Sequence, residues 1–216
     1  MRKKYNGTEK KRCVVIGGAP ITETAWVRSH LREDDFIIYC DCGLRHREAL
    51  GAPAHLVVGD FDSHPAPDFP VETISLPREK DDTDSVFAVK EALRRGYEDF
   101  LLLGVFGGRL DHSLANVSIL LMLDGLGKAA LAVDDFSELC VVSRQAAEIA
   151  PGFPYFSLVA LDGTAEAVTI TGAKFPLEQG RITPEYQYAV SNEPLPGQTA
   201  RVQVGSGRLL LLRDRV

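Results

Sequence analysis

The stretch that decides the fold reads KDDTDSVFAVKEALRRGYEDFLLLGVFGGRLDHSLAN and covers residues 80–116. It predicts a helix, a buried strand and a glycine turn into a second helix. Thr83 is suited to the N-cap of the first helix, whose apolar side chains recur at helical spacing, and Gly96 is suited to the left-handed residue that ends it. The nearly continuous apolar run at 101–106 is typical of a parallel strand covered on both faces. The stretch therefore predicts an α/β sheet.

Charged side chains gather where this strand ends. The glycine pair at 107–108 permits a sharp turn, so Arg109, Asp111 and His112 follow at the carboxyl edge of the sheet. Ligands bind at this edge in open α/β sheets. Asp84 begins the preceding helix, whose N-terminus we expect at the same edge.

Two more acids, Asp60 and Asp62, follow the predicted strand at 55–58. Residues two apart in an extended segment point the same way, so both carboxylates face one space. They repel each other unless a cation lies between them, and Mg²⁺ binds carboxylates while leaving positions for phosphate oxygens. A solvated acidic turn is the alternative. The acids expected nearby at positions 84 and 111 favour the metal site.

The first strand, at 13–16, runs into Gly17 and Gly18, and a helix is expected at 22–31. A helix start offers free N–H groups to phosphate. The turn matches neither of the common glycine-rich phosphate motifs, so a purely structural turn is equally compatible. Asp41 comes just after the next predicted strand, at 36–39, and so we expect it at the same edge of the sheet.

Composition sets outer limits. The chain has 216 residues, of which 45% are hydrophobic and 25% charged, as in ordinary globular proteins. A formal charge of -6 argues against a nucleic-acid partner. No apolar segment approaches the ~20 residues that span a membrane, so we expect no membrane association and a cytoplasmic location. The four cysteines lack zinc-site spacing, which predicts reduced thiols.

Beyond about Asp135 the pattern changes to short strands separated by turns, with no long helical period. We expect residues 1–137 to form an α/β domain with a mostly parallel, Rossmann-like sheet. We expect residues 138–216 to form a small all-β sandwich domain.

Four segments together resemble the bacterial thiamine pyrophosphokinase family. They are GGAP at 17–20, GDFDS at 59–63, KDDTD at 80–84 and GGRLDHSLAN at 107–116. The resemblance implies a nucleotide-binding catalytic domain and a thiamine-binding sandwich, working as a homodimer with thiamine near the subunit interface. It also implies Mg²⁺-dependent transfer of the pyrophosphoryl group of ATP to the hydroxyl of thiamine, which gives thiamine diphosphate and AMP.

The resemblance further implies roles for individual residues. It makes Asp60, Asp62 and Asp84 the ligands of Mg²⁺, and it adds Arg109 and Asp111 to the catalytic set. The residues expected at ATP are Gly17, Gly18, Asp41, Lys80, Arg109 and His112. Those expected at thiamine are Ser191, Asn192 and Glu193. The adenine contacts, the number of metal ions and any general base stay open.

Two other functions are compatible with the acidic motif. A glycosyltransferase can hold a sugar-nucleotide diphosphate through D-x-D and a metal, but it has no need of the segment at 80–84. A non-catalytic sensor would bind Mg-nucleotide without producing AMP.

Overall fold

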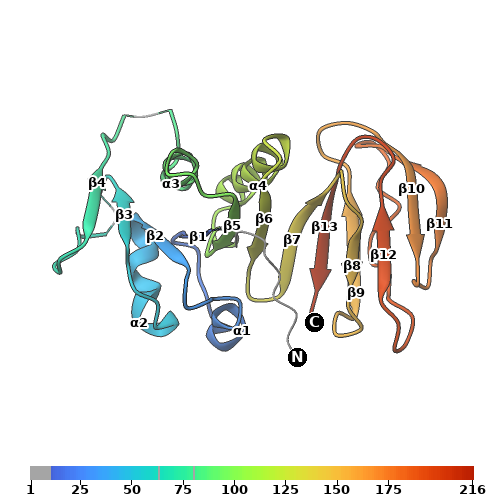
Figure 1. Cartoon of the computed structure of the whole chain (residues 1–216), viewed down its shortest axis with the longest axis horizontal. Coiled ribbons are helices and arrows are strands. Elements are labelled where there is room, and N and C mark those ends of the chain that lie inside the picture. The colour runs from blue at the N-terminus through green and yellow to red at the C-terminus, as the bar shows by residue number, and fades with distance from the viewer. Residues whose placement is uncertain (1–10, 63, 80) are drawn as a thin grey trace, which may run out of the picture.

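The computed structural model of the chain describes residues 11–62, 64–79 and 81–216 (Figure 1). The first part alternates strands and helices: β1 (Arg12–Ile16), α1 (Thr24–Arg28), β2 (Phe36–Cys40), the 3₁₀ helix η1 (Asp41–His46), α2 (Arg47–Leu50), β3 (Leu56–Gly59), β4 (Glu72–Ser75), α3 (Asp84–Arg94), β5 (Asp99–Leu103), α4 (Leu110–Gly125) and β6 (Ala129–Val133). Strands alone follow: β7 (Ser137–Val142), β8 (Ala147–Ile149), β9 (Tyr155–Val159), β10 (Ala165–Thr171), β11 (Leu177–Ile182), β12 (Ala200–Gln203) and β13 (Leu209–Asp214).

Strands β4, β3, β2, β1, β5 and β6 lie side by side in that order and run parallel. The chain moves outward from β1 to β4 and then crosses back to place β5 on the other side of β1. The strand order therefore reverses between β1 and β5, and ligands bind beyond the carboxyl ends of the strands at such a point. Ile16 pairs with Leu103, so both strands end level and their loops leave the sheet together.

Both faces of this parallel sheet are covered, which explains the continuous apolar runs. Every residue of β1 is buried, and its side chains alternate between two cores. Val15 packs into the core that contains α3 and α4, whereas Val14 packs into the core that contains α1 and α2. Figure 1 shows the two helix pairs on opposite sides of the sheet. The prediction of a mostly parallel α/β sheet is confirmed.

The sheet continues past residue 137 through three antiparallel strands, β7, β13 and β9. The remaining strands form a separate antiparallel sheet in the order β11, β10, β12 and β8. Strand β13 serves both halves, because Leu210 packs under the α/β helices while Leu209 and Leu211 pack against the second sheet. The predicted antiparallel strands are present, but three of the seven extend the first sheet. The division into 1–137 and 138–216 stays a prediction.

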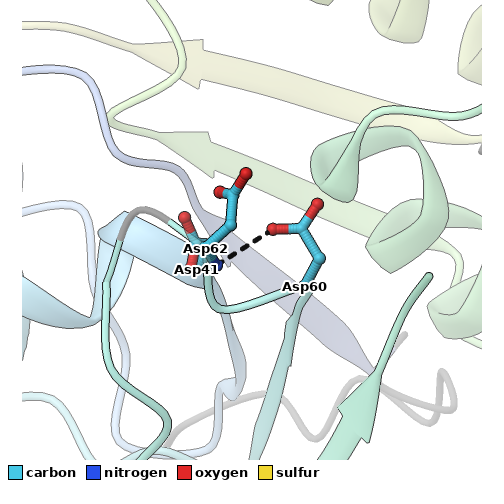
Figure 2. A group of neighbouring side chains, drawn as sticks. All are labelled: Asp41, Asp60 and Asp62. Atoms are coloured by element: carbon cyan, nitrogen blue, oxygen red, sulfur yellow. Dashed lines mark hydrogen bonds between the residues drawn. The ribbon is translucent and has the colours of Figure 1, made fainter. Parts of the chain in front are cut away.

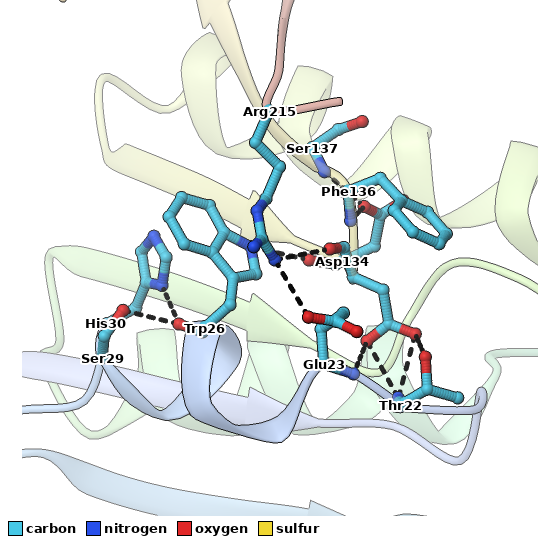
Figure 3. A network of polar contacts seen from close by, with 10 residues as sticks. Thr22, Glu23, Trp26, Ser29, His30, Asp134, Phe136, Ser137 and Arg215 are labelled. Carbon is cyan, nitrogen blue, oxygen red and sulfur yellow. Dashed lines mark hydrogen bonds and ion pairs between the residues drawn. The ribbon is translucent and has the colours of Figure 1, made fainter. Parts of the chain in front are cut away.

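The segment between β1 and α1 is anchored to the middle of the large sheet (Figure 3). The Thr22 backbone N–H donates to both carboxylate oxygens of Asp135, at 2.9 Å each. The Trp26 indole N–H donates to the carbonyl of Asp134 at 3.0 Å, and the Arg215 guanidinium lies 4.8 Å from the Trp26 ring centroid. Since the two acids connect β6 to β7, these contacts fix the loop after β1 against the junction of the two halves.

Local predictions for α3 are confirmed. The Thr83 hydroxyl accepts a hydrogen bond from the Val86 N–H at 3.3 Å, and Gly96 has φ of +87° just past the helix end. The predicted helix at 22–31 is shorter, because α1 covers only Thr24–Arg28. All four cysteines are free. Among the described residues, no helix is long and apolar enough to cross a membrane.

Candidate functional site

Two glycine loops meet where the strand order reverses. The Gly17 N–H donates to the carbonyl of Leu103, and the Ala19 N–H donates to that of Gly104, both at 2.8 Å. A Cβ atom on Gly17 would lie 2.6 Å from the Gly104 carbonyl oxygen, so only glycine fits there. Gly104 itself has a left-handed φ of +58°. The loops after β1 and β5 therefore form one backbone-lined surface.

The 3₁₀ helix η1, which the sequence did not predict, holds the first of these loops in place. Nη2 of Arg45 donates to the Gly18 carbonyl at 2.5 Å, and Nε2 of His46 lies 2.8 Å from the Ala19 carbonyl. Because a carbonyl only accepts, Nε2 carries the hydrogen. Burial lowers the pKa of His46, so the ring is neutral near pH 7. Both contacts span 27 residues, which explains why no local pattern indicated them.

Three carboxylates converge beside these loops (Figure 2). Asp41, Asp60 and Asp62 each offer an oxygen atom, and these atoms lie within 4.8 Å of one another. Phe61, between the two acids of the D-x-D motif, packs towards the core and has φ of +56°. The expectation that Asp60 and Asp62 face one space is therefore confirmed.

Asp41 is the buried member of this acidic cluster, with 8% of its surface exposed. It begins η1 with φ of +37°, a strained conformation for a residue other than glycine. Its Oδ2 accepts from the Cys42 thiol at 3.2 Å. Its Oδ1 is buried and accepts from no residue that the structure describes. A buried carboxylate oxygen without a donor is costly, and a hard divalent cation with oxygen ligands would satisfy it.

Asp84 lies at the start of α3 and lines the same cavity. The three carboxylates that converge include Asp41 and not Asp84. The sequence had predicted Asp84 as the third ligand of Mg²⁺, beside Asp60 and Asp62. Asp41 had been assigned to ATP instead. The signal for its position was its place directly after β2, one strand away from the D-x-D motif.

Arg109 and Asp111 form an exposed ion pair at the start of α4. Nη2 and Nε of Arg109 donate to the two carboxylate oxygens of Asp111 at 2.5 Å and 3.2 Å. These hydrogen bonds lower the pKa of Asp111 and raise that of Arg109. Arg109 and His112 line the cavity, but Asp111 does not.

Asn116 is a buried polar residue to which the sequence assigned no role. Its side-chain amide donates to the Val105 carbonyl at 2.7 Å, and the residue also lines the cavity. The Ser113 hydroxyl accepts from the Gly107 N–H and donates to the Arg109 carbonyl, both at 3.1 Å. These contacts fix the glycine turn between β5 and α4.

The cavity itself has a volume of about 660 Å³. Eight of the predicted site residues line it: Gly17, Gly18, Asp41, Asp60, Asp62, Asp84, Arg109 and His112. It is also lined by residues that the sequence did not single out, including Cys42, Arg45, Arg78 and Asn116. Lys80, predicted to approach a phosphate, lies outside the described residues.

The residues expected at thiamine lie elsewhere, in the β-rich half. Asn192 is 3% exposed, and its side-chain amide donates to the Phe175 carbonyl at 2.8 Å and accepts from the Phe175 N–H at 3.1 Å. Ser191 has φ of +57°, and the Glu193 carboxylate pairs with Lys174 at 2.7 Å. The amide of Asn192 is therefore engaged in holding the local backbone.

Beside Asn192 lies a small cavity of about 100 Å³ with a largely apolar lining that includes Phe175, Leu177, Tyr188 and Val190. Phe175, Tyr188 and Val190 are substantially exposed. Of the residues that the structure describes, none lines both this cavity and the larger one.

A glycine-lined cavity with carboxylates and arginines, at the point where an α/β sheet reverses its strand order, is typical of nucleotide-binding proteins. Comparison with known families is consistent with this class. Residues 27–129 match the thiamin pyrophosphokinase catalytic domain, and residues 143–209 match the thiamin pyrophosphokinase vitamin B1 binding domain. The chain belongs to the thiamin pyrophosphokinase family.

Solved structures agree with this assignment. Thiamin pyrophosphokinase from Geobacillus thermodenitrificans is 27% identical, with a TM-score of 0.80 over 94% of this chain and 97% of that one. The enzyme from Bacillus subtilis shares the fold at 23% identity, with a TM-score of 0.82 over 95% and 100% of the two chains. That from Candida albicans shares it at 14% identity, with a TM-score of 0.75 over 95% and 89%. No curated protein sequence matches the chain.

Proposed function

We propose that this protein is a Mg²⁺-dependent thiamine diphosphokinase, which transfers the pyrophosphoryl group of ATP to the hydroxyl of thiamine and releases AMP. The observation that carries the proposal is the convergence of three carboxylates, two glycine loops and several arginines in one cavity of an α/β sheet. Pyrophosphoryl transfer mainly requires positioning and charge neutralisation, because the negative charge is spread over phosphate oxygens. The cavity offers groups for both tasks.

The cation site is assigned to the acidic cluster. Asp41, Asp60 and Asp62 supply the ligand oxygens. Asp84 lines the same cavity and would bind the cation directly or through a water molecule. The orphaned Oδ1 of Asp41 fits a hard cation, as does the oxygen-only donor set. Bound Mg²⁺ would neutralise phosphate charge during transfer.

The phosphate chain is assigned to the glycine loops and Arg109. Backbone at Gly17 and Gly18 can approach a ligand closely because no side chain intervenes. Arg109 is exposed at the start of α4, so its guanidinium can leave Asp111 and donate to phosphate oxygens in bidentate fashion. Asp111 then serves to orient Arg109 between turnovers.

Thiamine is assigned to the surface around Ser191 and Glu193, where the Glu193 carboxylate would exchange its partner Lys174 for the positive charge of thiamine. This surface lies by β9, which is the last strand of the large sheet and four strand intervals away from β5. At ~4.8 Å per interval the separation is about 19 Å, too far for direct transfer within one chain. We therefore propose a homodimer in which thiamine held by one copy meets ATP held by the other.

The test of the reaction is to incubate the purified protein with ATP, Mg²⁺ and thiamine and to separate the products. We expect equal amounts of AMP and thiamine diphosphate, and neither in the presence of EDTA. Asp60→Asn, Asp62→Asn and Asp84→Asn should each lower kcat by ~10²-fold or more with the fold retained. Exposed Asp68 is the matched control, and Asp68→Asn should leave activity unchanged. Bound but unconsumed ATP would contradict the proposal and favour a sensor.

The shared site is tested by complementation. Asp60→Asn lacks a metal ligand, and Glu193→Lys places a positive charge at the proposed thiamine surface. If each active site takes residues from two copies, a mixed dimer of the two variants has one intact site and one that carries both changes. Since about half of the dimers in an equal mixture are mixed, mixing the two inactive variants restores about a quarter of wild-type activity. A mixture as inactive as its components would refute the shared site but not the reaction.

A further inference from the structure

We propose that Arg45 is a substrate-binding residue whose guanidinium binds a phosphate group of the nucleotide. The proposal rests on the proposed function, since it names a further contact of the same substrate. Arg45 lies on η1 and lines the large cavity, next to the loop after β1.

The guanidinium is held in a fixed position by two backbone carbonyls. Nε donates to the Cys42 carbonyl at 3.0 Å, and Nη2 donates to the Gly18 carbonyl at 2.5 Å. A guanidinium has more N–H donors than these two contacts use. The remaining donors stay available for a ligand, and the side chain has already lost much of its rotamer freedom before the ligand arrives.

Gly18 allows this arrangement. A Cβ atom at position 18 would lie 3.2 Å from Nη2 of Arg45 and 2.6 Å from the Cβ of Cys42. The guanidinium therefore lies directly against the glycine backbone, on the surface that we assign to the phosphate chain. A side chain at this position would displace Arg45 as well as narrow the cavity.

Arg45 also differs in its charge balance from the other two arginines that line the cavity. Arg109 pairs with Asp111 at 2.5 Å, and Arg78 lies 3.9 Å from Asp62. Arg45 forms no ion pair with any residue in the described ranges. The hydrogen bonds that hold its guanidinium go to backbone carbonyls, which carry no full negative charge, so an anionic ligand can pair with it.

A phosphate is the anion that suits this geometry. A planar guanidinium donates to two phosphate oxygens at once, which a lysine cannot reproduce. The neighbouring acidic cluster would hold the cation that accompanies a polyphosphate. The cation and Arg45 would thus neutralise the phosphate chain from two sides.

The experiment compares wild type with Arg45→Met and Arg45→Lys. Arg47→Met is the matched control, because it removes the same charge two residues further on, where the guanidinium packs 3.9 Å from the Phe69 ring centroid and does not line the cavity. The measurements are the Kd of Mg-ATP by calorimetry at several salt concentrations, the KM of each substrate, and the unfolding temperature without ligand.

We expect Arg45→Met to weaken Mg-ATP binding by about 10- to 100-fold, the loss typical of a charged hydrogen bond, while the KM of thiamine is unchanged. The Kd should also depend less steeply on salt, because one screened charge contact is lost. Arg45→Lys should recover only part of the affinity, and Arg47→Met should behave as wild type.

Two results would overturn the proposal. One is unchanged affinity for Mg-ATP in Arg45→Met. The other is weaker binding with an unchanged salt dependence and a lower unfolding temperature, which would mean that Arg45 only supports the loop. A wild-type protein that binds Mg-ATP but makes no thiamine diphosphate would refute the reaction and still allow Arg45 to be tested.

Discussion

Replacing Asp41 with asparagine should have opposite effects on the metal-free and the metal-bound protein. Asp41 is buried. One of its carboxylate oxygens lies within 4.8 Å of one carboxylate oxygen of Asp60 and one of Asp62. Without a cation these three like charges repel. With a cation they are its ligands. Asp41→Asn keeps the shape of the side chain and removes one of the charges.

The size of the repulsion follows from the separation. Two unit charges 4.8 Å apart interact by about 3.5 kcal/mol at an effective dielectric constant of ~20. Asp62 has a side chain that is 40% exposed, so solvent screening reduces the net repulsion felt by Asp41 to about 1 kcal/mol. For a chain of this size that corresponds to an increase of about 2–4 °C in the unfolding temperature of metal-free Asp41→Asn.

The metal-bound state should respond in the other direction. A ligand that binds only the folded protein stabilises it by about 2.7 kcal/mol when present at 100 times its Kd. If asparagine weakens Mg²⁺ binding by ~10²-fold, that stabilisation falls to about 0.4 kcal/mol at the same concentration. Thermal unfolding of wild type and Asp41→Asn, with EDTA and with Mg²⁺, measures both effects.

The control and the refuting result are both specific. Asp68→Asn makes the same change of net charge at an exposed position outside the cavity, and it should shift neither unfolding temperature. If metal-free Asp41→Asn unfolded at a lower temperature than wild type, or if Mg²⁺ stabilised both proteins equally, the acidic cluster would not be the cation site.

Three further changes test other parts of the site and its support. Arg109→Ala should raise the KM of ATP about tenfold or more and leave that of thiamine unchanged, because a charged phosphate contact is lost; a change in the thiamine KM alone would place Arg109 at the wrong substrate. Hydrogen bonds from Arg94 and Arg95 lower the pKa of Glu91 to about 2, from 4.5, so their stabilisation is fully present above pH 4.5 and is lost as the pH falls towards 2. Glu91→Gln should therefore cost about 2 kcal/mol in urea unfolding at pH 7 and almost nothing near pH 2. Thr83→Ala should cost about 1 kcal/mol through loss of the α3 N-cap, and Thr83→Ser should recover it.

The parts of the fold that the sequence predicted depend on neighbouring residues. Thr83 and Gly96 delimit α3 because cap geometry is set within one helical turn. Asp60 and Asp62 face one space as predicted, although through a local turn at Phe61 with φ of +56° and not through an extended segment. Arg45, which the sequence did not single out, acts over a long separation, since it contacts a loop 27 residues earlier in the chain.

In the second half, too, long-range strand pairing could not be predicted from local patterns. Short strands and turns correctly indicated antiparallel structure. They could not indicate that β13, the last strand, inserts between β7 and β9 and so extends the parallel sheet. That pairing is decided by which faces of β13 can be buried. With Leu209 and Leu211 facing one core and Leu210 the other, only a position between two packed layers satisfies both.

This continuity of the sheet has a consequence for the activity. One sheet fixes the distance between the phosphate cavity by β5 and the surface around Asn192 by β9, and packed strands cannot shorten it. If thiamine binds near Asn192, its hydroxyl must reach the phosphate of a second copy. Specific activity should then fall when the enzyme is diluted below the dissociation constant of the dimer, as followed by light scattering and turnover on the same samples. Activity that stayed constant in a monomer would instead place thiamine inside the large cavity, which aspartates as well as arginines line. The separation along the sheet therefore favours the two-copy arrangement over a site built within one chain.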